Sequence, residues 1–143
     1  MFDEPVRNVM QLEKFLRAAP ETLVSKAAEL MAAKNVGAIM VVEDDRLIGI
    51  FTERDVVFRV VAQGLDARVT RLADVMTRTP HTVDPQKPFG YALLVMHEQG
   101  FRHLPVVRDG KLIGIVSSRS AMDPELEEFA LEANRRKRFG EIR

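Results

Sequence analysis

The sequence contains no cysteine. This absence excludes disulfide bonds and thiol chemistry, and it is typical of proteins of a reducing compartment, so we expect a cytoplasmic location. No apolar run approaches the roughly 20 residues that a membrane-spanning helix needs. The segment MFDEPVRNVM (1–10) also lacks the apolar stretch of a signal peptide. The sequence therefore predicts no association with a membrane.

The sequence also has no excess of either charge. Lys and Arg total 21, as do Asp and Glu, so the formal net charge is zero. A balanced charge gives no support for nucleic acid as a partner. The composition, 46% hydrophobic and 29% charged, is that of a globular chain, and 143 residues suit one compact domain or two very small ones.

An internal repeat organises the chain. LIGIFTERD (47–55) returns as LIGIVSSRS (112–120), and a shift of 65 residues aligns 20–55 with 85–120 at 11 of 36 identical positions. The upstream pieces VRNVM (6–10) and LADVM (72–76) match at a shift of 66. Two copies are too few for a solenoid, which needs about three units. The repeat instead predicts a pair packed about a pseudo-twofold axis.

Each copy has the same predicted order of elements, β-α-β-β-α, which gives an α+β fold. Helical spacing of apolar residues alternates with short apolar runs rich in β-branched residues, and Asp or Gly marks the turn between the two longer strands. The expected elements are first strands near 17–20 and 81–85, helices at 21–35 and 88–100, hairpins at 38–52 and 103–117, and a helix at 52–64 that recurs after residue 117.

Four motifs in this order carry a resemblance to a known family. They are GIFTERD (49–55), DVM (74–76), FRHLPVV (101–107) and GKLIGIVS (110–117). The chain resembles a tandem pair of cystathionine-β-synthase (CBS) domains, called a Bateman module. The resemblance implies regulatory modules that bind AMP, ADP, ATP, NAD(H) or S-adenosylmethionine and that associate as homodimers. It divides the chain into repeat 1 (4–65), repeat 2 (66–122) and a C-terminal helix and tail (123–143).

Thr52 and Asp55 are the strongest candidates for ligand contact. They lie at the start of a predicted helix, where free N–H groups favour phosphate, and a carboxylate can accept from two ribose hydroxyls. The family pattern assigns Asp55 to ribose and Thr52 to phosphate. The alternative is that the two residues only cap their helix.

The second copy carries Ser117 and Ser120 where the first has Thr52 and Asp55. A serine cannot offer a charged, two-pronged acceptor, and charge-assisted hydrogen bonds are about twice as strong as neutral ones. We therefore expect two unequal clefts, with the better ribose site in the first copy.

The resemblance implies further residues around the clefts. Arg102, His103 and Arg119 are expected to contact phosphate, and Arg54 could also reach it. The alternatives are local packing for His103 and a solvated position for the two helix arginines. The segment from Met76 to His81 is expected to cradle the base together with Phe101 and Arg102. The candidate ligand-binding residues are therefore Thr52, Arg54, Asp55, Met76, His81, Phe101, Arg102, His103, Ser117, Arg119 and Ser120.

These features predict a regulatory module that binds an adenine nucleotide and passes the signal through its dimer geometry to an unidentified effector protein. Phosphate-facing basic groups make S-adenosylmethionine the less favoured ligand. A dimerisation scaffold with clefts that bind nothing is the alternative. No nucleophile–base pair supports an enzyme, and the spacing of the three histidines fits no zinc pattern, so we expect neither catalysis nor a metal.

Overall fold

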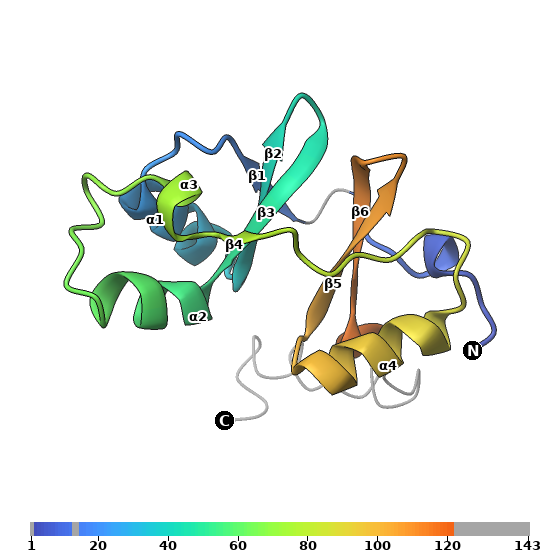
Figure 1. Ribbon diagram of the computed structural model, residues 1–143. Helices are drawn as coiled ribbons and strands as arrows, with labels where there is room; N and C mark the ends of the chain where they lie inside the picture. Colours follow the sequence, from blue (N-terminus) through green and yellow to red (C-terminus); the bar gives the residue numbers. More distant parts are fainter. Residues whose placement is uncertain (1, 13–14, 122–143) are drawn as a thin grey trace, which may run out of the picture.

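The computed structural model describes residues 2–12 and 15–121 and has the mixed α+β fold that the repeat predicts (Figure 1). Its elements are η1 (Val6–Asn8), β1 (Leu16–Ala18), α1 (Val24–Lys34), β2 (Ala38–Glu43), β3 (Arg46–Thr52), α2 (Glu53–Asp55), η2 (Val56–Val61), α3 (Leu72–Val75), β4 (Thr77–Arg78), α4 (Phe89–Gln99), β5 (His103–Arg108), β6 (Lys111–Ser117) and η3 (Ser118–Ala121). The predicted C-terminal helix (123–143) lies outside the described residues.

The internal repeat is reproduced residue by residue. α4, β5 and β6 each begin and end 65 positions after α1, β2 and β3. The register of the β2–β3 hairpin shifts between Val41 and Val42, and that of β5–β6 shifts between Val106 and Val107, at the equivalent place. The two hairpins are therefore copies of one structure, including its irregularity.

Turn chemistry explains why the hairpins and helices end where they do. The β2–β3 turn holds Asp44 and Asp45 at φ of 52° and 64°, and its counterpart holds Asp109 and Gly110 at 52° and 80°. Two consecutive positive φ values define the tight hairpin turn whose twist matches the strands, and Asp and Gly tolerate it best. α1 ends in the same way, with Asn35 in the left-handed conformation that stops a helix.

The segment that precedes each repeat packs against the hairpin of the other repeat. The strand order is β1-β2-β3-β6-β5, with β4 paired to β3. Thr77 of β4 pairs with Ile50, whereas Gln11 from the N-terminal segment pairs with Ile115 of the second hairpin. Figure 1 shows η1 beside α4 and β6, and α3 beside α1 and β3. Each half of the molecule is therefore completed by a segment that precedes the other repeat.

Three apolar clusters hold these layers together. One lies under α1 and includes Ile39 and Phe51, both fully buried, together with Met76 from the α3–β4 segment. An equivalent cluster lies under α4 and includes Val6 from the N-terminus. The third joins the two hairpins and contains Ala38, Met40, Leu112 and Ile115. Because β2 is buried on both faces, its sequence is a continuous apolar run.

The helix predicted at 52–64 differs from expectation. Only Glu53–Asp55 is α-helical, and Val56–Val61 forms a π-helix, with the Ala62 N–H donating to the Val57 carbonyl at 2.8 Å. Four of the six π-helical residues are valine, and β-branched side chains crowd the preceding α-helical turn, which a wider turn relieves. No helix within residues 2–12 and 15–121 is both long and apolar enough to cross a membrane.

Candidate functional site

Asp55 and Thr52 form a complete capping box at the end of β3. The Asp55 N–H donates to Thr52 Oγ1 at 3.3 Å, and the Thr52 N–H donates to Asp55 Oδ2 at 2.9 Å. The Thr52 hydroxyl also lies 3.3 Å from Oδ2. The capping role considered for this pair is therefore present in the structure, and a ligand contact would be additional to it.

The second carboxylate oxygen of Asp55 has two partners, neither of which is among the predicted site residues. Thr77 Oγ1 lies 3.4 Å from Oδ1, and Arg59 Nε lies 3.4 Å from the same atom. The Asp55 side chain is only 8% exposed, whereas that of Arg59 is 51% exposed. Arg59 follows Asp55 by four residues, which places the two side chains on one helix face, so the sequence spacing could have predicted this ion pair. Thr77 carried no comparable signal, because it reaches Asp55 only through the pairing of β4 with β3.

Met76 contributes packing with its side chain and an acceptor with its backbone. Its side chain is 3% exposed and rests on Gly49, where an added Cβ would lie 2.9 Å from Met76 Cγ. The Met76 carbonyl accepts a hydrogen bond from Arg59 Nη1 at 3.0 Å. The glycine of the LIGI motif is thus required by the close approach of the neighbouring segment.

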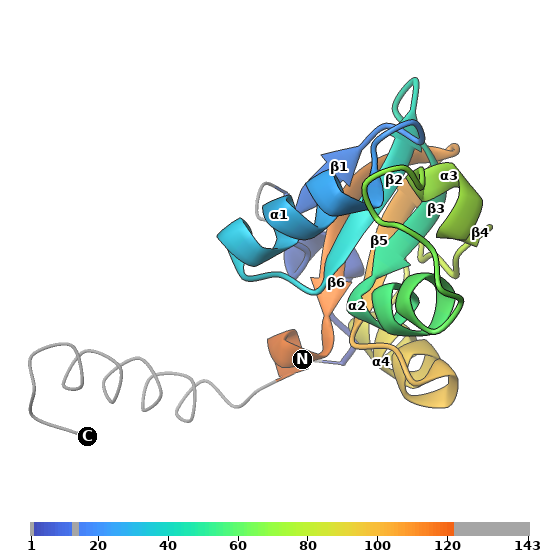
Figure 2. The same cartoon turned by 90° about the vertical axis from the view of Figure 1, so that its left-hand side faces the viewer.

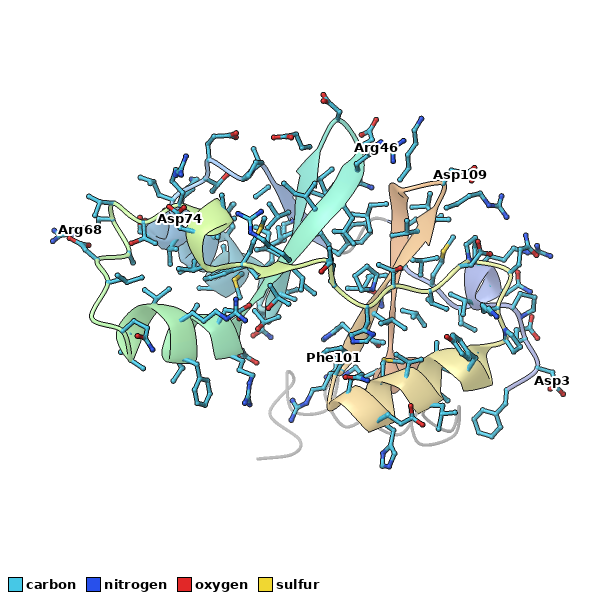
Figure 3. All side chains as sticks on the ribbon, in the orientation of Figure 1. Asp3, Arg46, Arg68, Asp74, Phe101 and Asp109 are labelled. Atoms are coloured by element: carbon cyan, nitrogen blue, oxygen red, sulfur yellow. The ribbon has the colours of Figure 1, made fainter. Side chains whose placement is uncertain are left out.

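His81 and Phe101, both predicted beside the base, lie against each other. Their ring centroids are 5.6 Å apart and their planes are tilted by 52°, a favourable arrangement for two aromatic rings. Both residues are exposed, and Figure 3 shows Phe101 where α4 passes into β5. The structure therefore brings together an aromatic residue from the segment after β4 and one from the loop before β5.

Arg54 lies over an exposed aromatic ring. Its guanidinium lies 4.5 Å from the centroid of the Phe58 ring, and Phe58 is 54% exposed. A cation over an exposed ring is a surface contact. This position corresponds to the solvated alternative considered for Arg54.

The second repeat places its candidates at positions equivalent to those of the first. The Ser118 N–H donates to the Arg102 carbonyl at 3.0 Å, just as the Glu53 N–H donates to the Gly37 carbonyl at 3.0 Å. Ser117 is buried at the end of β6, opposite His103 in the strand register. The backbones of Arg119 and Ser120 follow in η3. The loop before β5 and the turn after β6 are therefore joined by a backbone hydrogen bond.

His103 lies in a positive environment. Partial burial of its ring and the guanidinium groups of Arg119 and Arg102 lower the pKa of His103 below its ordinary value of 6.5, and Glu53 of the first repeat opposes this shift. His103 keeps an exposed edge, so the neighbouring guanidinium groups contribute to this shift together with desolvation. Three basic residues and a carboxylate from the other repeat thus face a common region.

A groove on the outer surface of the first repeat is lined by residues on both sides of Asp55 in the chain, but not by Asp55 itself. Figure 2 shows α1 and α2 on the outside of the β2–β3 hairpin. The groove lies between α1 and η2. It is lined by Ala28, Met31, Ala32, Asn35, Val36, Gly37, Glu53, Val56 and Val57. Among the described residues, no group of three or more metal-ligating side chains could hold a metal ion.

The comparison with protein families identifies the chain. The family model described as "CBS domain" matches twice, at residues 6–62 and 72–124. The chain therefore belongs to the CBS-domain family and carries a tandem pair of these domains, as the resemblance implied.

Known proteins are similar to this chain in sequence and fold. The meiotically up-regulated gene 70 protein of Schizosaccharomyces pombe is 36% identical over 90% of this chain, which spans only 21% of that protein. An uncharacterized conserved protein from Pyrococcus horikoshii is 30% identical, with a TM-score of 0.77 over 90% of this chain and 94% of that one. The CBS domain pair of protein MJ0100, in complex with 5′-methylthioadenosine and S-adenosyl-L-methionine, is 22% identical, with a TM-score of 0.72 over 82% and 96%.

Proposed function

We propose that this chain is a regulatory module whose first-repeat cleft binds an adenine nucleotide. Asp55 accepts hydrogen bonds from the ribose hydroxyls. The observation that carries the proposal is the buried carboxylate of Asp55 at a helix start, held in place by the capping box through Oδ2. A fixed acceptor of this kind suits two adjacent hydroxyls. A homodimer then passes the signal to an effector protein.

The charged and aromatic residues of the second repeat and of the segment before it support a nucleotide rather than a neutral ligand. Arg102 and Arg119 supply positive charge beside His103 in the second repeat, where a phosphate would be favoured. The contact of His81 with Phe101 offers aromatic surface for a base. The MJ0100 pair, of the same fold, is described with two adenosine compounds. AMP, ADP, ATP and NAD(H) are therefore the preferred candidates, and S-adenosylmethionine belongs among the compounds to be tested.

The outer helices support a homodimer. Val57, Phe58 and Val61 of η2 are 54%, 54% and 68% exposed, and Tyr91 and Leu94 of α4 are 45% and 53% exposed. Clustered apolar side chains of this size on the surface are typical of association sites. A ligand that binds one dimer arrangement better than another would shift the population between them, which gives the effector a shape to recognise.

Thermal unfolding with a panel of ligands tests the proposal. AMP, ADP, ATP, NADH and S-adenosylmethionine are each added at 1 mM, with guanosine monophosphate as the matched control for charge. A ligand present at 100 times its Kd adds about 2.7 kcal/mol of stability, so micromolar binding produces a shift of several degrees. A shift with the adenine compounds and not with the guanine control supports the proposal. Equal melting temperatures throughout would contradict it.

A scaffold whose clefts bind nothing is the second candidate, and one observation favours it. Both oxygens of Asp55 already have partners within the chain, so the residue has a structural role without a ligand. A dimer that forms at micromolar concentration and whose sedimentation and stability no adenine compound changes would establish the scaffold.

A further inference from the structure

We propose that Arg59 is a built-in competitor for the ribose site: its guanidinium and the Thr77 hydroxyl occupy the acceptor positions on Asp55 that a ribose diol would take. This inference rests on the proposed nucleotide-binding function and adds a specificity-determining residue to it.

The proposal starts from the acceptor capacity of the Asp55 carboxylate. An ionised carboxylate has about four lone-pair positions. The Thr52 N–H and the Thr52 hydroxyl lie 2.9 and 3.3 Å from Oδ2, and the Thr77 hydroxyl and Arg59 Nε each lie 3.4 Å from Oδ1. Three of these contacts are hydrogen bonds and the Arg59 contact is an ion pair, so each carboxylate oxygen already has two donor groups beside it. Ribose hydroxyls that approach Oδ1 would therefore compete with the Thr77 hydroxyl and the Arg59 guanidinium.

The two oxygens differ in how readily they can be released. The contacts at Oδ2 belong to the capping box and fix the start of the helix, so their loss would weaken the fold. Both contacts at Oδ1 are long, and each comes from a side chain that can rotate away. Oδ1 is therefore the oxygen at which a ligand can exchange with internal partners.

Arg59 suits the role of a displaceable partner. Its side chain is 51% exposed, and it bridges the Asp55 carboxylate and the Met76 carbonyl, the latter at 3.0 Å. The hydrogen bond to the Met76 carbonyl keeps the guanidinium beside the carboxylate, and the guanidinium stays exposed to solvent. Solvent reaches the half-exposed guanidinium and screens its attraction to the buried carboxylate, so a ligand can replace this contact at modest cost.

The second repeat does not carry this arrangement in its sequence. Residue 120, the counterpart of Asp55, is serine, and residue 124, the counterpart of Arg59, is proline. The carboxylate and the competing cation are therefore both absent from the second copy. The competition is a property of the first cleft.

Calorimetric titration of adenosine into Arg59→Met tests the proposal. Adenosine has the ribose diol but no phosphate, so the loss of a positive charge from the protein does not by itself weaken binding. Methionine preserves the apolar part of the arginine side chain. Arg71→Met is the matched control. Arg71 is 55% exposed and pairs with Asp74, not with Asp55, at 3.2 Å.

The expected result is a two- to fivefold tighter affinity of Arg59→Met for adenosine, which corresponds to about 0.4–1 kcal/mol. Arg71→Met should bind as the wild type does. 2′,3′-Dideoxyadenosine, which lacks both hydroxyls, should bind all three proteins equally. An affinity of Arg59→Met for adenosine equal to or weaker than that of the control would overturn the proposal.

A measurement without ligand separates this inference from the proposed function. Carbodiimide coupling followed by mass spectrometry reports how accessible the Asp55 carboxylate is. We expect more labelling of Asp55 in Arg59→Met than in the wild type or Arg71→Met. If labelling increases but no protein binds adenosine, the Arg59 contact is supported and the ribose site is rejected. If labelling is unchanged, Arg59 is not the group that covers Oδ1.

Discussion

Gly49→Ala should destabilise the protein by about 1–3 kcal/mol, because the new methyl group would enter the space that Met76 fills. The added Cβ would lie 2.9 Å from Met76 Cγ and 3.1 Å from Cε, and would meet the sulfur more closely still. Optimal carbon–carbon contacts are about 3.5–4.0 Å. Met76 is 3% exposed, so it cannot move into solvent to relieve the overlap.

Urea unfolding followed by circular dichroism measures this loss, and thermal unfolding should show a fall of about 3–10 °C. Gly37→Ala is the matched control. Its Cβ would approach the end of the exposed, flexible Glu53 side chain, at 2.9 Å from Oε1, which can move at little cost. A double-mutant cycle with Met76→Ala should show coupling of at least about 1 kcal/mol. Additive losses, or equal losses for Gly49→Ala and Gly37→Ala, would refute the packing argument.

Two further predictions concern the candidate site. Thr52→Ala should lose about 1 kcal/mol of stability in urea unfolding because it removes the capping hydroxyl, whereas Thr52→Ser should keep most of it; equal losses would mean that the cap contributes nothing. The pKa of His103 is lowered in the folded state, so the unfolded chain takes up a proton first as the pH falls below about 6.5. Stability should therefore decline from pH 7.5 to 5.5, and this decline should be smaller in His103→Gln; equal slopes in the two proteins would contradict the assignment.

Most of the repeat could be predicted because local chemistry and the repeat pointed to the same structure. The helix predicted at 21–35 is found at Val24–Lys34, and the hairpin predicted at 38–52 is found with its turn at Asp44 and Asp45. These elements depend on periodicity and turn residues, both of which a sequence displays.

The exchange of upstream segments could not be predicted. Gly49 receives Met76, and Gly114 receives Met10 and the Gln11 carbonyl, so the two docking surfaces are nearly the same. Either upstream segment has the side chains to fit either surface. Which one docks depends on the path of the connecting chain, and residue type does not encode that path.

The partners of Asp55 were missed for a related reason. Thr52 is three residues away and belongs to a recognisable motif, but Thr77 is 22 residues away and arrives through strand pairing. The π-helix was also missed, because sequence patterns distinguish helix from strand better than one helix type from another. The sequence thus predicted the Thr52–Asp55 motif of the candidate site, but not the contacts that Asp55 makes with residues of other elements.

The most direct test of the central claim is calorimetric titration of AMP into the wild type and Asp55→Asn. The substitution preserves shape and removes the charge, and Asp74→Asn, which alters an exposed pair with Arg71, is the control. We predict micromolar binding to the wild type and the control, and a loss of about 1.5–3 kcal/mol, roughly ten- to a hundredfold, in Asp55→Asn. Equal affinity in all three proteins would contradict the assignment of Asp55 to the ribose.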